Sequence, residues 1–133
     1  GMSPLNSLRC VLDSPKQHTV LVKLFEARLR IAHAVLTGVQ GKCEGTTQRV
    51  TVSCKVVNSP PAGENSTPVE DAETFNLCTL TPSQPQAKMD LDVSNLEHDH
   101  DTLVQVTCSA SKGRDSNFVV ELFGHAIGDF EVR

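Results

Sequence analysis

The segment QRVTVSCKVV, residues 48–57, decides the fold class of this chain. Apolar and polar residues alternate from Arg49 to Val56, and most of the apolar positions are β-branched. Such a pattern is typical of a strand with one buried and one exposed face. We therefore expect an inward side and an outward side on this strand. The inward side is Val50, Val52, Cys54 and Val56, and the outward side is Arg49, Thr51, Ser53 and Lys55.

The same two-residue period recurs along the chain, and no convincing helical period competes with it. KMDLDV, TLVQVTC and AIGDFEV alternate clearly at 88–93, 102–108 and 126–132, and shorter β-like segments lie at 73–80 and 118–123. Residues 58–71 are rich in Pro, Ser and Asn, and residues 81–87 contain two Pro and a Ser, which favour turns and loops. We predict an all-β fold, an antiparallel eight-stranded β-sandwich.

Residues 18–36 alternate with a change of phase. Phe25, Ala27, Leu29 and Ile31 share one parity, whereas Val20, Val22 and Leu24 have the other. A helix is the competing interpretation, but it would place Arg28 in the middle of the apolar stripe. We therefore expect a strand with a bulge or break near Leu24, which keeps the apolar side inward.

At 133 residues the chain has the size of a single domain. We expect that domain at 18–133, preceded by a tag remnant and an uncertain N-terminal segment at 1–17. No stretch approaches the roughly 18 apolar residues of a membrane span, so any membrane association would be peripheral. The five cysteines are an odd number without a C-x-x-C pair, which predicts a reducing, cytoplasmic location.

The net charge of −4 is unevenly distributed. Residues 16–55 contain seven basic and two acidic residues, whereas residues 64–101 contain nine acidic residues and one basic residue. We expect two electrostatic faces, of which the basic one suits anionic partners. Nucleic acid fits poorly, because the chain is acidic overall and no aromatic residues are interleaved with the bases.

The order of the segments resembles a C2 domain. LFEARLRIAHAVLTGVQGK followed by QRVTVSCKVV is similar to the opening strand, glycine-bearing loop and basic strand of that family. TLVQVTC, SASKGRDSN and LFGHAIGDFEV are similar to its closing strand, ligand loop and last strand. The resemblance implies a C2-like sandwich and a membrane-trafficking, lipid-transfer or signalling protein.

The loops expected to carry calcium ligands hold too few carboxylates. Calcium requires six to eight oxygen ligands, but the loop at 37–48 offers Glu44 beside Lys42, and the last loop offers Asp115 beside Arg114 and Lys112. The resemblance therefore implies a calcium-independent C2 domain. The run EHDHD at 97–101 is a weak metal candidate, which we interpret as a solvated acidic loop, and we expect no metal and no cofactor.

A basic binding patch is expected on the outward faces of two strands. If residues 25–36 pair with residues 48–57 so that Ile31 faces Cys54, then Arg30 faces Lys55. Two like charges opposite one another are mildly destabilising, which suggests a role outside folding; a solvated face is the alternative. The residues expected to bind anionic lipid or an acidic protein surface are Arg28, Arg30, Arg49, Lys55, Lys112 and Arg114.

Catalysis has no support in the sequence motifs, since no nucleophile elbow, phosphate loop or metalloprotease helix pattern is present. We predict a non-catalytic, C2-like module of a larger intracellular protein, which docks on anionic membrane lipid or on a protein partner. The alternative is an extracellular immunoglobulin-like adhesion or receptor domain. That alternative would have a Cys54 to Cys108 disulfide and a glycan at Asn65, but the chain lacks the Trp and Tyr typical of such domains.

Overall fold

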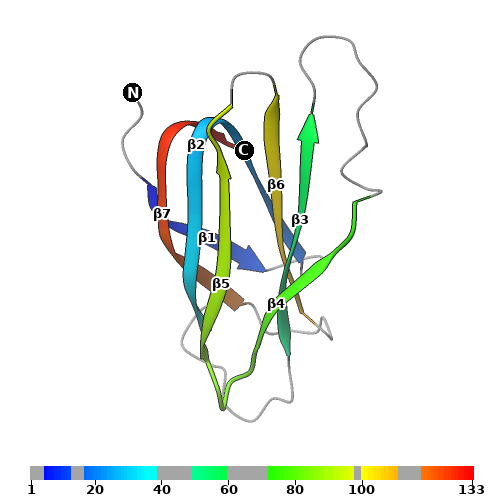
Figure 1. Cartoon of the computed structure of the whole chain (residues 1–133). Helices are drawn as coiled ribbons and strands as arrows, with labels where there is room; N and C mark the ends of the chain where they lie inside the picture. Colours follow the sequence, from blue (N-terminus) through cyan, green and yellow to red (C-terminus); the bar gives the residue numbers. More distant parts are fainter. Residues whose placement is uncertain (1–4, 13–16, 39–48, 60–71, 98–99, 111–117) are drawn as a thin grey trace.

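The computed structural model shows an all-β protein whose strands form one nearly closed antiparallel sheet (Figure 1). It describes residues 5–12, 17–38, 49–59, 72–97, 100–110 and 118–133. Seven strands and no helix lie within these ranges. The strands are β1 (Leu5–Leu12), β2 (Gln17–Gly38), β3 (Val50–Ser59), β4 (Phe75–Leu80), β5 (Gln86–Asn95), β6 (Asp101–Ala110) and β7 (Phe118–Val132).

The sheet is organised around β2, which is 22 residues long. The strand order is β1-β7-β2-β6-β3-β4, and β5 also pairs with β2. One edge of β2 pairs with β7, while the other edge pairs first with β6 and then with β5. The sheet therefore divides at β2 into a β5 half, formed by β1, β7, β5 and the end of β2, and a β6 half, formed by the start of β2, β6, β3 and β4.

Two bulges in β2 keep its apolar residues inside. Its register shifts between Leu24 and Glu26, and again between Ile31 and His33. The first shift confirms the bulge expected near Leu24, and the second was not predicted. Each bulge adds one residue to β2, so the buried positions change parity there and the apolar side chains continue to point inward. The buried side is Val20, Val22 and Leu24, then Ala27, Leu29 and Ile31, then Ala34 and Leu36.

Two glycines of β7 lie opposite these bulges. Gly128 pairs with Ala27 and has a φ of 113°, a backbone conformation that favours glycine. Gly124 pairs with Ile31, and a Cβ atom built there would overlap the carbonyl oxygen of Arg30. Because the backbones of β7 and β2 approach so closely there, β7 can follow the bulged strand only if both positions are glycine, which has no Cβ atom.

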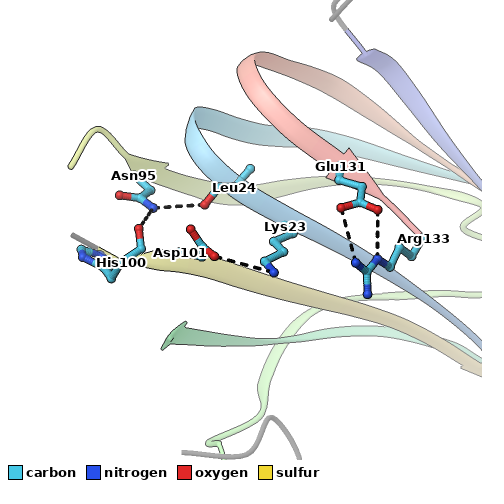
Figure 2. A network of polar contacts seen from close by, with 7 residues as sticks. All are labelled: Lys23, Leu24, Asn95, His100, Asp101, Glu131 and Arg133. Carbon is cyan, nitrogen blue, oxygen red and sulfur yellow. Dashed lines mark hydrogen bonds and ion pairs between the residues drawn. The ribbon is translucent and has the colours of Figure 1, made fainter. Parts of the chain in front are cut away.

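Asn95 lies at the point along β2 where its pairing with β6 ends and its pairing with β5 begins, and the side chain of Asn95 is buried. Its Nδ2 donates hydrogen bonds to the carbonyl oxygens of Leu24 (3.1 Å) and His100 (2.8 Å), and Figure 2 shows both. Its Oδ1 accepts a hydrogen bond from the backbone N–H of Glu97 at 3.2 Å. This one amide therefore satisfies backbone groups at the first bulge and in the connection between β5 and β6.

The expected strand at 48–57 is confirmed as β3, with Val50, Val52 and Cys54 buried. The expected alternation of β5 and β6 is also confirmed. By contrast, the segments at 118–123 and 126–132 are one strand, β7, and residues 5–12 form β1 against it. Seven strands rather than eight therefore lie in the described part of the chain. The largest fully buried side chains are Leu24, Leu29, Leu80, Leu122, Val22, Val50, Val52, Val104, Val106 and Val120.

Candidate functional site

The outer surface of β7, β2 and β5 is the candidate interaction surface, and we call it the β5 face. Its central row is His125 on β7, Arg30 on β2 and Asp92 on β5, because these residues are register partners. The next row towards the first bulge is Ile127, Arg28 and Ser94. The row between them, which contains Leu29, points inward, because side chains alternate between the two faces of a strand. The outward rows place aliphatic, basic and acidic side chains on one surface.

Arg28 and Asp92 form an ion pair across two strands of this face. Arg28 Nε donates to Asp92 Oδ1 at 2.9 Å, and Nη2 donates to Oδ2 at 2.6 Å. These hydrogen bonds lower the pKa of the Asp92 carboxyl, as do the charges of Arg28, Arg30 and His125, and they raise the pKa of Arg28. The positive charge of Arg28 is thus largely neutralised by Asp92.

Arg30 is available for an external contact. It is exposed, and its guanidinium makes no hydrogen bond or ion pair within 4 Å in the described part of the chain. Its charge contributes to the low pKa of Asp92, which lies opposite it on β5. Arginine is enriched at protein interfaces because its planar fork binds carboxylates and stacks on aromatic rings.

Two large apolar side chains project from the same face of β7. Phe123 is 39% exposed and Ile127 is 57% exposed. The ring of His33 lies next to Phe123, with 6.3 Å between the ring centroids and a tilt of 50°. With His125 between them in the strand, these residues give the β5 face an apolar stripe beside its arginines.

The expected pairing of residues 25–36 with residues 48–57 is wrong. Ile31 lies opposite Leu91 and Gly124, and Arg30 lies opposite Asp92 and His125. Lys55 is on β3, in the β6 half, where it lies opposite Gln105 of β6. The reason is topological: β2 already pairs with β7 on one edge and with β6 and β5 on the other, so no edge is open to β3.

The six predicted binding residues are not brought together. Arg28 and Arg30 lie on the β5 face, and Lys55 and Arg49 lie on or beside β3. Lys112 and Arg114 lie outside the described residues. Sequence reasoning missed Asp92, His33, Phe123, His125 and Ile127. The last three could have been found, since they have the parity opposite to the buried Ala126 and Phe130.

A second polar cluster surrounds the start of β6 and the end of the chain. Lys23 Nζ lies 3.6 Å from Asp101 Oδ2 and 5.4 Å from the centroid of the Phe25 ring. Arg133 Nε donates to Glu131 Oε1 at 3.2 Å (Figure 2). Each cation therefore already has an acidic partner, so the cluster has little excess charge for an anionic ligand.

The cysteines and histidines form no recognisable chemical centre in the described part of the chain. No group of three metal-binding side chains occurs there, and residues 98–99 of the EHDHD run lie outside it. Cys54 and Cys108 do not form a disulfide. Because Cys54 pairs with Val106 and Cys108 with Val52, they are diagonal neighbours on adjacent strands of one half. This placement differs from the bridge between two sheets typical of immunoglobulin domains.

Comparisons with known proteins identify no family. No family model matches this chain, and no curated protein matches it. One solved structure to which it is similar is a chain of the empty virus-like particle of cowpea mosaic virus. The two share 11% sequence identity with a TM-score of 0.31, over 98% of this chain and 82% of that chain. A similarity this low carries no inference about function.

Within the described ranges, no helix is long and apolar enough to cross a membrane.

Proposed function

We propose that this chain is a non-catalytic β-sandwich module that docks a partner protein on its β5 face. The observation that carries the proposal is the combination of exposed Phe123 and Ile127 with an uncommitted Arg30 on one outer surface of the sheet. Aromatic, aliphatic and arginine side chains in this combination are characteristic of the energetically important centre of protein interfaces.

A protein surface fits this face better than an anionic membrane. Membrane attraction depends on the number of basic residues that reach the bilayer together, each contributing on the order of 1 kcal/mol. Arg28 is paired with Asp92, and Lys55 lies on the other half of the sheet. Arg30 is accompanied by acidic as well as basic neighbours, which is typical of a surface with a specific protein partner.

A calcium-independent C2-like sandwich is the class of architecture that we propose for the module. The order of strands and glycine-bearing loops along the sequence supports it, as does the antiparallel all-β sheet. An intracellular, reduced setting is part of the same proposal, and the reduced thiols of Cys54, Cys78 and Cys108 are compatible with it. The extracellular immunoglobulin-like alternative gains no support from the positions of Cys54 and Cys108.

The test compares two face variants with two matched controls. Ile127→Asp and Arg30→Glu change the β5 face, whereas Phe75→Asp and Lys55→Glu make the same kinds of change in the β6 half. Partners are captured from extracts of the source cells and then measured with purified proteins. We expect the two face variants to weaken binding at least about tenfold and the controls to leave it unchanged.

Two results would contradict the proposal. A purified partner whose affinity falls with Lys55→Glu but not with Ile127→Asp would place the interface on the β6 half. Flotation with vesicles that contain anionic lipid, lost in Arg30→Glu, would replace the protein partner by a membrane surface.

A further inference from the structure

A hollow opens on the β5 face at the second bulge of β2. The pairing of β2 with β5 jumps from Ile31 with Leu91 to His33 with Lys88, so Ala32 alone lies against two residues of β5. The mismatch leaves a space of about 490 Å³ between the outer sides of the two strands. Its lining within the described residues is Ala32, His33, Gln86, Ala87 and Lys88.

The lining of the hollow is mainly apolar, and it includes two alanines. Ala32 is exposed and contributes only a methyl group, Ala87 is partly buried against the core, and Phe123 borders His33 with 6.3 Å between the ring centroids. The volume lies within the range of about 300–1,000 Å³ that is usual for ligand pockets. The hollow is also wide open to solvent, so it suits a side chain that enters from an attached main chain better than an enclosed small molecule.

The polar groups at the rim favour a carboxylate. Lys88 is exposed, and no ion pair or hydrogen bond of its side chain occurs within the described part of the chain. Gln86 adds an amide donor and His33 an imidazole. Asp90 is exposed two residues along β5 from Lys88 but does not line the hollow, and the carboxylate of Asp92 is bound by Arg28. An ammonium beside an apolar hollow is therefore complementary to an aliphatic group that carries a neighbouring negative charge.

We infer that this hollow receives a short segment of the partner protein in which an aliphatic side chain is next to Asp or Glu. The aliphatic side chain would lie against Ala32 beside the His33 ring, and the carboxylate would pair with the ammonium of Lys88. The inference rests on the proposed function, because it assigns the acidic, apolar segment to the partner that docks on the β5 face. It explains why the bulge carries alanine at its exposed position, since a larger side chain there would fill the hollow.

The probe is a short peptide of alternating leucine and glutamate with serine spacers, blocked at both ends. Its controls replace every glutamate by lysine or every leucine by serine. Amide chemical shifts of the folded protein are followed by NMR as peptide is added. We expect saturable shifts at Ala32, His33 and Lys88 with the first peptide only. Lys88→Glu should raise the dissociation constant about tenfold, because it replaces an attraction by a repulsion.

Ala32→Phe tests the apolar contact without removing any charge, and Thr79→Phe and Lys55→Glu are the matched controls on the β6 half. All four variants are first compared with the parent by circular dichroism. Equal binding of the lysine peptide, shifts outside the hollow, or no saturation at millimolar peptide would overturn the inference. A natural partner that is lost with Ile127→Asp but retained by Ala32→Phe and Lys88→Glu would overturn it too, while leaving the docking face intact.

Discussion

Asn95 is a buried polar residue whose hydrogen bonds hold the point where two strands diverge. Asn95→Ala would remove the donors that satisfy the Leu24 and His100 carbonyls and the acceptor for the Glu97 N–H. Because unsatisfied buried groups cost about 1–3 kcal/mol, we expect the free energy of unfolding to fall by about that amount. Urea denaturation measures the change. Ser94→Ala, at the exposed neighbouring position, is the control, and equal stability of the two variants would contradict this role.

The ion pair of Arg28 with Asp92 predicts a pH effect at the residue scale. The pKa of Asp92 is lower in the folded protein than in the unfolded chain, where it is about 3.9. Its contribution to stability is therefore fully present above the unfolded pKa and is lost as the pH falls through the folded pKa. We expect NMR titration to give Asp92 a pKa below that of the unfolded chain, and this pKa should rise in Arg28→Gln. An unchanged pKa in Arg28→Gln would show that the pair is not formed in solution.

At the scale of the strand, each bulge of β2 depends on a glycine of β7. Gly128→Ala would place a side chain at a φ of 113°, and Gly124→Ala would drive a methyl group into the β2 backbone. Each change should lower the free energy of unfolding by about 2 kcal/mol or more. Ile127→Ala, exposed on the same strand, should change it by less than about 0.5 kcal/mol. Chemical denaturation of the three variants checks the contrast, and tolerated alanines would mean that the bulges can relax.

Local alternation made much of this fold predictable. Val50 to Val56 on β3 and Val104 to Cys108 on β6 follow the two-residue period, and the phase change at Leu24 revealed the first bulge. The second bulge escaped because Ala32 and Ala34 are small residues that fit either face. Local patterns contain no information on pairing between distant segments, so the sequence could not show that β5 and β7, rather than β3, flank Arg30.

The candidate site shows the same limit. Exposure of Arg28 and Arg30 follows from their parity in β2, and it is observed. Neutralisation of Arg28 by Asp92 depends on a contact between residues 64 positions apart, which only the sheet topology determines. The hollow beside Lys88 is formed at the second bulge, so the sequence could not predict the hollow without predicting that bulge. Charge counted along the chain therefore overestimated the basic surface.

The whole molecule is tied together by β2, which belongs to both halves of the sheet, and by the end of β7, which pairs with the start of β2. β2 pairs with β6 through its first residues and with β5 through its last, and β7 follows it across the first bulge. Loss of β2 from either half would thus expose the core of the other, because buried residues of β2 belong to the core of both halves. We expect the two halves to unfold as one cooperative unit.

Cysteine labelling tests this cooperativity from a distance. Cys54 lies on β3 in the β6 half, where burial raises the pKa of its thiol, and burial raises the pKa of Cys78 on β4 to about 11. At about pH 8 the folded protein should therefore alkylate slowly at both positions, through opened molecules. If Gly128→Ala costs about 2 kcal/mol of global stability, labelling of Cys54 should accelerate about thirtyfold, although Gly128 lies on another strand. Mass spectrometry of the alkylated peptides measures the rates, with Thr79→Ala as an exposed control. An unaltered rate at Cys54, together with a destabilised β5 half, would mean that the two halves open separately.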